Sequence, residues 1–441
     1  MNQSSNLAVN TLLTDQVRQV AGTACEPIDA WLEAHRQELV RVRRHLHMHP
    51  EPSGRERETT SYLAQRLDEV GVTATVLRDG LGLVADAVIG DPGPDAARVA
   101  LRADIDALKI QDAKSVEYRS RCDGVMHACG HDVHSSIVLG IARAVAGQAD
   151  DVQLEPGRGM HLRYLFQPAE EICQGAQWLV EQGVLEGVDA ILGLHVDPEN
   201  PAGQFGVRYG PLTAVCHEVA ISVRGQGGHA ARPHQSRDPL AAAISLASTL
   251  YSQLPRGVDS RQPSVFSIGR INGGTLPNVI PDEVEILGSL RTVELGDDTV
   301  LKEKIQRIAA GVASSTETEI DVVFRASLEA VRNDTGVTSA IEAAAVSVAG
   351  EEAVRRIEQP SMGGEDFSVY QQHVPGSMFR LGSGTQPRHL LHTPGFDIDE
   401  DCLVAGARVM IRAALLWGLS GKNGLAETRV SIDDEGTGAG G

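Results

Sequence analysis

The segment MHACGHDVH, residues 126 to 134, places three histidines, one cysteine and one aspartate within nine positions. Side chains of these types bind metal ions or transfer protons. Cys129 and His131 are too close together for a zinc-finger knuckle, and no two cysteines in the chain have the spacing of a zinc ribbon. Gly130 lets the backbone turn so that both side chains can converge. The segment alone leaves two interpretations open, a pair of metal ligands before a helix or a helix N-terminus with polar caps.

Three further segments place candidate side chains directly after apolar runs. In FQPAEE, Glu170 and Glu171 follow a predicted strand. His195 follows an apolar run in ILGLHVDP, and His392 follows two leucines in LLHTPGFD. Taken alone, each has an ordinary explanation, because acidic residues favour helix N-termini and buried histidines are commonly satisfied within a core. Two adjacent carboxylates that are buried together repel each other, however, so one would stay protonated unless cations lie nearby.

Taken together, these side chains suit a two-metal hydrolase. One cysteine, three histidines and one glutamate at the strand ends of a single layer supply enough ligands for two divalent ions. A second glutamate beside them can act as general base on a metal-bound water, whose pKa falls from about 15.7 to about 7 on binding. Competing chemistries lack their motifs, because neither GxSxG nor HExxH occurs and the only Gly-Lys pair has no P-loop frame.

Alternating apolar runs and helical patterns must position these residues. An opening helix is expected from about Ile28 to Leu46, and strands then alternate with helices up to about residue 213, which predicts an α/β sheet with sites at its loops. Residues 214–326 instead show three β-rich runs and two helices, one with Asp238 as N-cap and Pro239 in its first turn. We therefore predict a catalytic domain at 26–213 and 327–421, an inserted α+β domain at 214–326, and loose termini at 1–25 and 422–441.

Composition narrows the class of protein. The 441 residues are 42% hydrophobic and 22% charged, which is typical of a soluble globular protein. The net charge of −20 argues against nucleic acid or an anionic membrane surface as a partner. No continuous apolar run reaches about 18 residues, and no secretory signal is readable, so no membrane span is expected. Six scattered cysteines do not form a disulfide framework. We expect a cytoplasmic protein.

Eight segments occur in an order that resembles the amidohydrolase branch of the aminoacylase-like dinuclear metallopeptidases, which includes hippurate hydrolase and the indole-acetyl-amino-acid hydrolases. The resemblance spans about residues 28 to 420. It implies a mixed-sheet α/β catalytic domain and an inserted, ferredoxin-like dimerisation or lid domain. The segments are LRADIDALKIQD, CDGVMHACGHDVHSSIVLG, FQPAEE, LGLHVDP, GQGGHAARPH, NGGTLPNVIPDEVEILGSLRT, SMGGEDFSVY and LLHTPGFDIDE.

The resemblance also implies roles for single residues. Glu170 matches the general base that activates a bridging water. His229 matches a histidine that the inserted domain sends into the partner subunit's active site, where it would stabilise the oxyanion. Asn278 and Arg291 match positions that could hold the amino acid's carboxylate. The metal ligands implied are Cys129, His131, Glu171, His195 and His392.

Other residues are expected to support this site. Asp104 and Asp106 stand two apart at a predicted strand end and match a family aspartate pair, which we interpret as orienting the ligands. Asp132 and His134 could play similar parts, or could be a helix cap and a packed helix residue. The histidines in RRHLHMHPE are expected to shape the fold near the site.

Two departures from the family pattern concern the pocket. Lys109 stands where the family usually has proline, and residues 172–174 replace a Gly-rich stretch after the glutamate pair. These bulkier residues could narrow the pocket, and Cys173 could compete as a thiolate near the ions. No implied ligand is lost.

The sequence therefore predicts a metal-dependent amidohydrolase that cleaves N-acyl amino acids. Two divalent ions per subunit are expected, with zinc favoured by thiolate and imidazole ligands, and manganese, cobalt or nickel as alternatives. The substrate would be a small acylated amino acid, and the inserted domain predicts a homodimer or tetramer. A dipeptidase or carboxypeptidase of the same fold is the alternative, and a non-catalytic metal- or ligand-binding protein is a third. The acyl group and the amino acid stay open.

Overall fold

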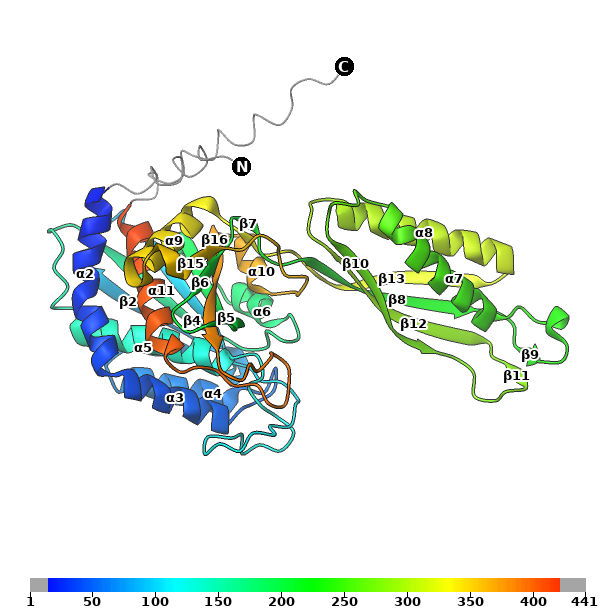
Figure 1. Cartoon of the computed structure of the whole chain (residues 1–441), viewed down its shortest axis with the longest axis horizontal. Helices are drawn as coiled ribbons and strands as arrows, with labels where there is room; N and C mark the ends of the chain where they lie inside the picture. The colour runs from blue at the N-terminus through cyan, green and yellow to red at the C-terminus, as the bar shows by residue number, and fades with distance from the viewer. Residues whose placement is uncertain (1–14, 421–441) are drawn as a thin grey trace, which may run out of the picture. The chain divides into compact units, whose positions relative to one another are not determined.

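Strands and helices alternate along much of the chain, and the computed structural model shows how they are arranged (Figure 1). The structure describes residues 15–420, and the chain divides into two units. Unit 1 comprises Met1–Gly210, Arg332–Glu358 and Val369–Gly441, and unit 2 comprises Pro211–Val331 and Gln359–Ser368. The sequence placed residues 359–368 in the catalytic domain, whereas the structure groups them with unit 2.

Unit 1 is built around an eight-stranded mixed sheet with the order β1-β2-β4-β3-β5-β16-β6-β15. Its four central strands, β4, β3, β5 and β16, run parallel, which brings their carboxyl ends to one edge of the sheet. This arrangement confirms the predicted α/β class. The strands are β1 (Ala74–Val76), β2 (Leu83–Gly90), β3 (Arg98–Asp104), β4 (Gly159–Gln167), β5 (Ala190–Pro201), β6 (Phe205–Val207), β15 (Val354–Arg356) and β16 (Gly376–Gly384).

The helices of unit 1 complete one hydrophobic core. The apolar helix α11 packs against α2, α5 and α9 near its centre. By length and composition α11 could cross a membrane, but 78% of it is buried inside the fold, as is usual for a core helix. The helices are α2 (Asp15–Ala34), α3 (Arg36–Met48), α4 (Arg57–Asp68), α5 (His131–Gln148), α6 (Gly175–Glu181), α9 (Thr335–Ala349) and α11 (Cys402–Leu419).

The N-terminal end differs from the prediction. Residues 15–25 were expected to be loose, but they form the first part of α2, with Ala21, Ala24 and Cys25 fully buried. These small apolar residues recur at helical spacing, and α2 packs against α5 and α11. The predicted opening helix is also divided into two helices, α2 and α3, at His35. The remaining predicted loose ends, 1–14 and 422–441, lie outside the described residues.

Unit 2 is a four-stranded antiparallel sheet with two helices packed on it. The chain order of strands and helices is β8-α7-β10-β12-α8-β13, and the sheet order β10-β12-β8-β13 is that of a ferredoxin-like fold, as predicted. Asp238 caps α7 as expected, because its Oδ1 accepts the N–H groups of Leu240 and Ala241 at 2.9 and 3.2 Å. The elements are β8 (Val215–Arg224), α7 (Pro239–Gln253), β10 (Ser264–Asn272), β12 (Glu283–Thr292), α8 (Asp297–Thr316) and β13 (Glu319–Leu328), with the short pair β9 (Gly228–His229) and β11 (Val279–Ile280).

Short elements complete the chain. A small helix, α10 (Phe367–Gln371), and two short strands, β7 (Gly210–Pro211) and β14 (Arg332–Asn333), fall where the sequence passes between the units. Single 3-10 turns occur at η1 (Arg78–Gly80), η2 (Pro233–Gln235), η3 (Leu254–Arg256) and η4 (Glu351–Ala353).

If α2 belongs to the core, truncating a buried side chain in it should be costly. Ile28 is fully buried, so we expect Ile28→Ala to lower the free energy of unfolding by about 2–5 kcal/mol. Glu26→Ala, an exposed neighbour on the same helix, should change it by less than about 0.5 kcal/mol. Urea denaturation followed by circular dichroism measures both. Equal stability of the two variants would contradict the packing of α2.

Candidate metal centre

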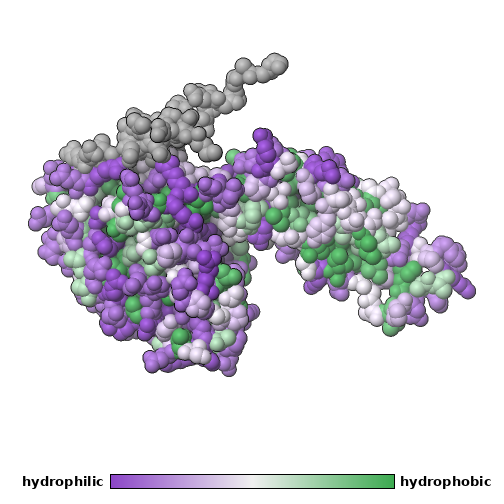
Figure 2. All heavy atoms as spheres, in the orientation of Figure 1, coloured by the Kyte–Doolittle hydropathy of each residue, from purple (hydrophilic) through white to green (hydrophobic). Residues whose placement is uncertain are grey.

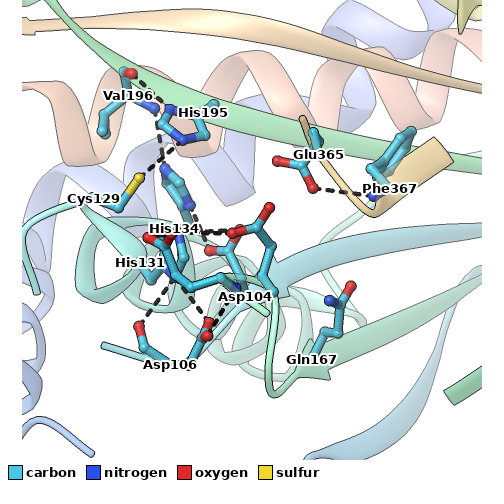
Figure 3. Close-up of polar contacts among 12 residues, drawn as sticks. Asp104, Asp106, Cys129, His131, His134, Gln167, His195, Val196, Glu365 and Phe367 are labelled. Carbon is cyan, nitrogen blue, oxygen red and sulfur yellow. Dashed lines mark hydrogen bonds and ion pairs between the residues drawn. The ribbon is translucent and has the colours of Figure 1, made fainter. Parts of the chain in front are cut away.

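The five side chains implied as ligands lie together in unit 1. His195 Nε2 is 3.4 Å from Cys129 Sγ, and His392 Nε2 is 3.3 Å from the same sulfur. Glu171 Oε1 lies 3.6 Å from His392 Nε2 and 3.9 Å from His131 Nε2. Figure 3 shows Cys129, His131 and His195 gathered at this point. The donor atoms are close enough to share one or two ions.

A glycine makes the approach of two of these side chains possible. Gly130 has a φ of +84° and stands between Cys129 and His131, the first residue of α5. A Cβ at this position would lie 2.4 Å from Val196 Cγ2, so any larger residue would displace the Val196 side chain. The sharp turn directs both neighbouring side chains into the cluster, as the sequence predicted from the residue type.

Two histidines are held in the tautomer that suits metal binding. His131 Nδ1 lies 3.0 Å from the Asp106 carbonyl oxygen and 3.1 Å from Asp106 Oδ1, so its Nδ1–H donates to this residue. His195 Nδ1–H donates to the Val196 carbonyl oxygen at 2.8 Å. In both rings Nε2 faces the cluster. His195 was predicted at a strand end, but it lies within β5, because β5 keeps pairing with β16 as far as Pro201.

His134 plays a different part from its neighbours. Its Nδ1–H donates to Asp104 Oδ1 at 2.6 Å, and its Nε2 accepts the Val196 N–H at 3.0 Å (Figure 3). With both ring nitrogens engaged, His134 supports the cluster and is not available as a ligand. Asp104 Oδ2 also accepts a hydrogen bond from Arg102 at 2.6 Å. Burial opposes the charge on Asp104, but His131 and Arg102 outweigh it and hold the pKa of this carboxyl well below its usual range.

Asp106 links three parts of the site. Besides His131, its carboxylate accepts the Glu171 N–H at 3.0 Å and the Ser53 hydroxyl at 2.6 Å. Although burial alone would raise the pKa of Asp106, these hydrogen bonds, led by that of His131, lower it. An ionised, fully bonded Asp106 thus orients one imidazole and fixes the backbone beside the glutamate pair.

Burial disfavours the negatively charged forms of two side chains in the cluster. It raises the pKa of the Cys129 thiol, and it raises the pKa of Glu171 in spite of His131 and His392 nearby. Within residues 15–420, His131 Nε2 and Glu171 Oε1 are buried without a hydrogen-bond partner, and such atoms are costly to leave unsatisfied. A divalent cation would lower both pKa values and satisfy both atoms. The set of sulfur, imidazole and carboxylate donors therefore fits a metal site of the zinc type.

Glu170 is set beside the cluster. Its side chain is nearly buried, and its Oε2 lies 3.9 Å from His131 Nε2. The residue before it, Ala169, has a φ of +57°, a conformation that costs energy for any residue other than glycine. This kink turns the chain after β4, so Glu170 and Glu171 both face the cluster from one short loop.

A buried ion-pair network lies beneath the N-terminus of α5. Asp132 accepts hydrogen bonds from Arg43 Nε at 2.9 Å and from His47 Nδ1 at 2.7 Å, and all three side chains are fully buried. Asp132 therefore ties α5 to α3, and His47 shapes the fold as expected. Sequence reasoning missed Arg43 and also Arg102. A charged residue within an otherwise apolar pattern was the signal, since such residues are buried only when paired.

The departures from the family pattern lie at exposed positions. Lys109 is exposed, and Ile172 exposes 46% of its surface. Cys173 is exposed with a φ of +55°, and its N–H donates to the Glu170 carbonyl oxygen at 2.7 Å. Among residues 15–420, no group of potential ligands includes Cys173, so the structure does not support a competing thiolate there.

The three remaining predicted residues belong to unit 2. His229 lies in β9 and Asn278 precedes β11, and the Ala230 N–H donates to the Asn278 carbonyl oxygen at 3.1 Å. Arg291 stands near the far end of β12, roughly 26 Å along the strand from Glu283. Its Nη1 donates to the Met362 carbonyl oxygen at 2.5 Å. Within one chain, unit 2 thus brings His229 and Asn278 together and keeps Arg291 apart from them.

Comparison with known proteins gives a consistent result. Residues 100–416 match the model of peptidase family M20/M25/M40. N-acetylcysteine deacetylase from Bacillus subtilis is 38% identical over 385 residues, which cover 87% of this chain and 98% of that protein. Thermostable carboxypeptidase 2 from Saccharolobus solfataricus is 34% identical, over 84% of this chain and 92% of that protein.

A solved structure has the same fold. The YXEP protein of Bacillus subtilis, described as a dinuclear metal-binding peptidase, is 33% identical and superposes with a TM-score of 0.74. The match covers 87% of this chain and 98% of that one.

If the cluster holds a metal ion, losing its sulfur should weaken binding. Cys129→Ala, Cys122→Ala and the wild type are passed over a desalting column in buffer with a low zinc concentration. We expect Cys129→Ala to retain about one zinc ion per chain less than the wild type, because the loss of a ligand lowers metal affinity. Cys122→Ala, which changes a half-buried cysteine outside the cluster, should retain the wild-type amount. Inductively coupled plasma mass spectrometry measures the metal. Unchanged zinc in Cys129→Ala would contradict a role for this thiol.

Proposed function

The chain belongs to peptidase family M20/M25/M40, and we propose that it hydrolyses the amide bond of N-acyl amino acids to give a carboxylic acid and a free amino acid. It is a metal-dependent amide hydrolase, as its relatives are. The observation that carries the proposal of hydrolysis is the pair of adjacent glutamates at the Cys-His cluster, because a binding site needs only one of them. The deacetylase relative, which is named for an acylated amino acid, supports this choice of substrate class.

In the proposed mechanism, two divalent ions would be held by Cys129, His131, Glu171, His195 and His392. Such ions would supply Lewis acidity toward the amide carbonyl and lower the pKa of water so that it can attack at neutral pH. Glu170 takes a proton from the attacking water at its carboxylate and later passes it to the leaving nitrogen. Asp106 keeps His131 in the required tautomer, and the hydrogen bond from the Glu171 N–H to Asp106 holds the loop that carries the base.

The donor set supports a choice of metal, and the free cysteines support a choice of compartment. We infer zinc, because thiolate and imidazole favour it, while manganese, cobalt or nickel could occupy the same ligands. All six cysteines are free in the structure, which suits a reducing cytoplasm.

We also infer a homodimer formed through unit 2. Strand β10 is an edge strand with one hydrogen-bonded neighbour in the described sheet, and open edges readily pair with another chain. Hydrophobic side chains are exposed on this strand and on α7 (Figure 2). They are Ile244, Tyr251, Val265 and Ile271, which expose 65%, 50%, 42% and 49% of their surfaces. A second copy of the chain covers such a surface and could bring His229 and Asn278 to its partner's site.

The alternative of a carboxypeptidase or dipeptidase rests on the relative from Saccharolobus solfataricus. Both reactions use the same metals and base, and they differ in whether the group joined to the amino acid is an acyl chain or a residue with a free amine. Arg291 matches a carboxylate-binding position of the family and would serve either substrate, because both carry a free carboxylate.

The zinc-loaded enzyme should hydrolyse N-acetyl, N-benzoyl and indole-acetyl amino acids faster than unblocked dipeptides with the same C-terminal residue. Release of the free amino acid measures each rate. Glu170→Gln should keep both ions yet lose turnover by about 1,000-fold, since it removes the base alone. Faster cleavage of the dipeptides would favour the peptidase, and an active Glu170→Gln enzyme would exclude this residue as the base.

Sharing of sites between subunits is tested by mixing two inactive chains. A hybrid of Glu170→Gln with His229→Ala has one site with an intact base and an intact histidine from the partner. Unfolding and refolding a mixture of equal amounts should therefore restore up to about one quarter of the wild-type rate, because half of the random dimers are hybrids. Each chain refolded alone is the control. If the mixture forms dimers but recovers no activity, the subunits do not share their sites.

A further inference from the structure

The loop before α4 reaches the segment that carries the glutamate pair. Glu56, the residue before α4, is fully buried. Its Oε1 accepts the Gly54 N–H at 2.9 Å and the Ala169 N–H at 2.8 Å. The second contact joins residues 113 positions apart in the sequence and meets the chain one residue before Glu170.

The Glu56 side chain does not cap α4, the helix that it precedes. A carboxylate at this position usually caps the helix by accepting an N–H from its first turn. Here no such hydrogen bond forms, and the N–H of Thr59 is instead accepted by Glu51 Oε2 at 2.7 Å. Glu51 thus takes over the capping role, which leaves Glu56 turned toward the loop after β4.

Glu170 is consequently fixed from both sides. The N–H before it, that of Ala169, is held by Glu56, and the N–H after it, that of Glu171, is held by Asp106 at 3.0 Å. Ala169 needs such support, because its φ of +57° is unfavourable for alanine. The Ser53 hydroxyl contacts Asp106 at 2.6 Å, so one loop, 53–56, reinforces both anchors.

We propose that Glu56 is a positioning residue that holds Ala169 in its left-handed conformation and thereby aims the carboxylate of Glu170 at the metal cluster. The role of Glu170 as base rests on the proposed function, whereas the contact of Glu56 with Ala169 does not.

The state of Glu56 suggests a matched pair of variants. Burial raises its pKa to about 7, and within residues 15–420 its Oε2 is buried without a hydrogen-bond partner. The contacts to Gly54 and Ala169 use Oε1, which accepts hydrogen bonds whether or not the other oxygen carries a proton. Glutamine presents the same acceptor and should preserve both contacts, while alanine removes them.

The test compares Glu56→Gln and Glu56→Ala with Glu58→Ala, an exposed glutamate on α4, in the zinc-loaded full chain. Hydrogen exchange of the peptide containing residues 167–173, read by mass spectrometry, should quicken about tenfold or more in Glu56→Ala only. With the best N-acyl amino acid, kcat should fall about tenfold or more in the same variant, with KM changed by less than about threefold and zinc retained. Glu56→Gln and Glu58→Ala should match the wild type in both readouts.

Normal exchange and kcat in Glu56→Ala would overturn the proposal, as would equal losses in Glu56→Ala and Glu56→Gln. If the alanine variant does not fold, Glu56→Asp is tested in its place. The aspartate side chain is one methylene shorter, so its carboxylate should lose the contact with Ala169. A wild type that cleaves no N-acyl amino acid would refute the proposed function alone, since the exchange of residues 167–173 still decides the role of Glu56.

Discussion

The burial of negative and nucleophilic groups without enough positive charge is the constraint around which unit 1 is organised. Cys129 and Glu171 both have raised pKa values because they are out of water, and each lies within hydrogen-bonding or ion-pair distance of histidines. Cations bound in such a cluster would lower the pKa values of both groups and favour their ionised forms. The hydrogen bonds around the cluster orient the side-chain atoms that would bind the ions, or hold the backbone that carries these side chains.

The parallel centre of the sheet explains how distant segments meet. Strands β3 and β4 pair in a register that sets Asp104 beside Gln167, and β5 runs alongside β3. The loops that follow these strands therefore open at the same edge, where Asp106 and the glutamate pair face α5. The kink at Ala169 and the turn at Gly130 complete the arrangement. Both residues have a positive φ, which turns the chain in a direction that a regular strand or helix does not take.

Much of this could be predicted from the sequence, and the limits have physical causes. Residue type and position after apolar runs were enough to bring Cys129, His131 and the pair of Glu170 and Glu171 into one hypothesis, because the ends of parallel strands meet. The resemblance to the family then implied which of the two glutamates is the ligand. The extent of β5 beyond His195 depends on pairing with β16, and the burial of residues 15–25 depends on packing against α11, so neither could be read locally. The contact between Glu56 and Ala169 also depends on tertiary packing, since the sequence of neither segment indicates that it contacts the other.

We propose that Cys129, His131, Glu171, His195 and His392 form one two-metal site with Cys129 as a ligand. Anomalous diffraction at the zinc absorption edge, from crystals of the zinc-loaded protein, tests it most directly. We expect two anomalous peaks per chain among the five side chains, one of them about 2.3 Å from the sulfur of Cys129. Peaks elsewhere on the surface, or an ion in the cluster that leaves this sulfur out of contact, would contradict it.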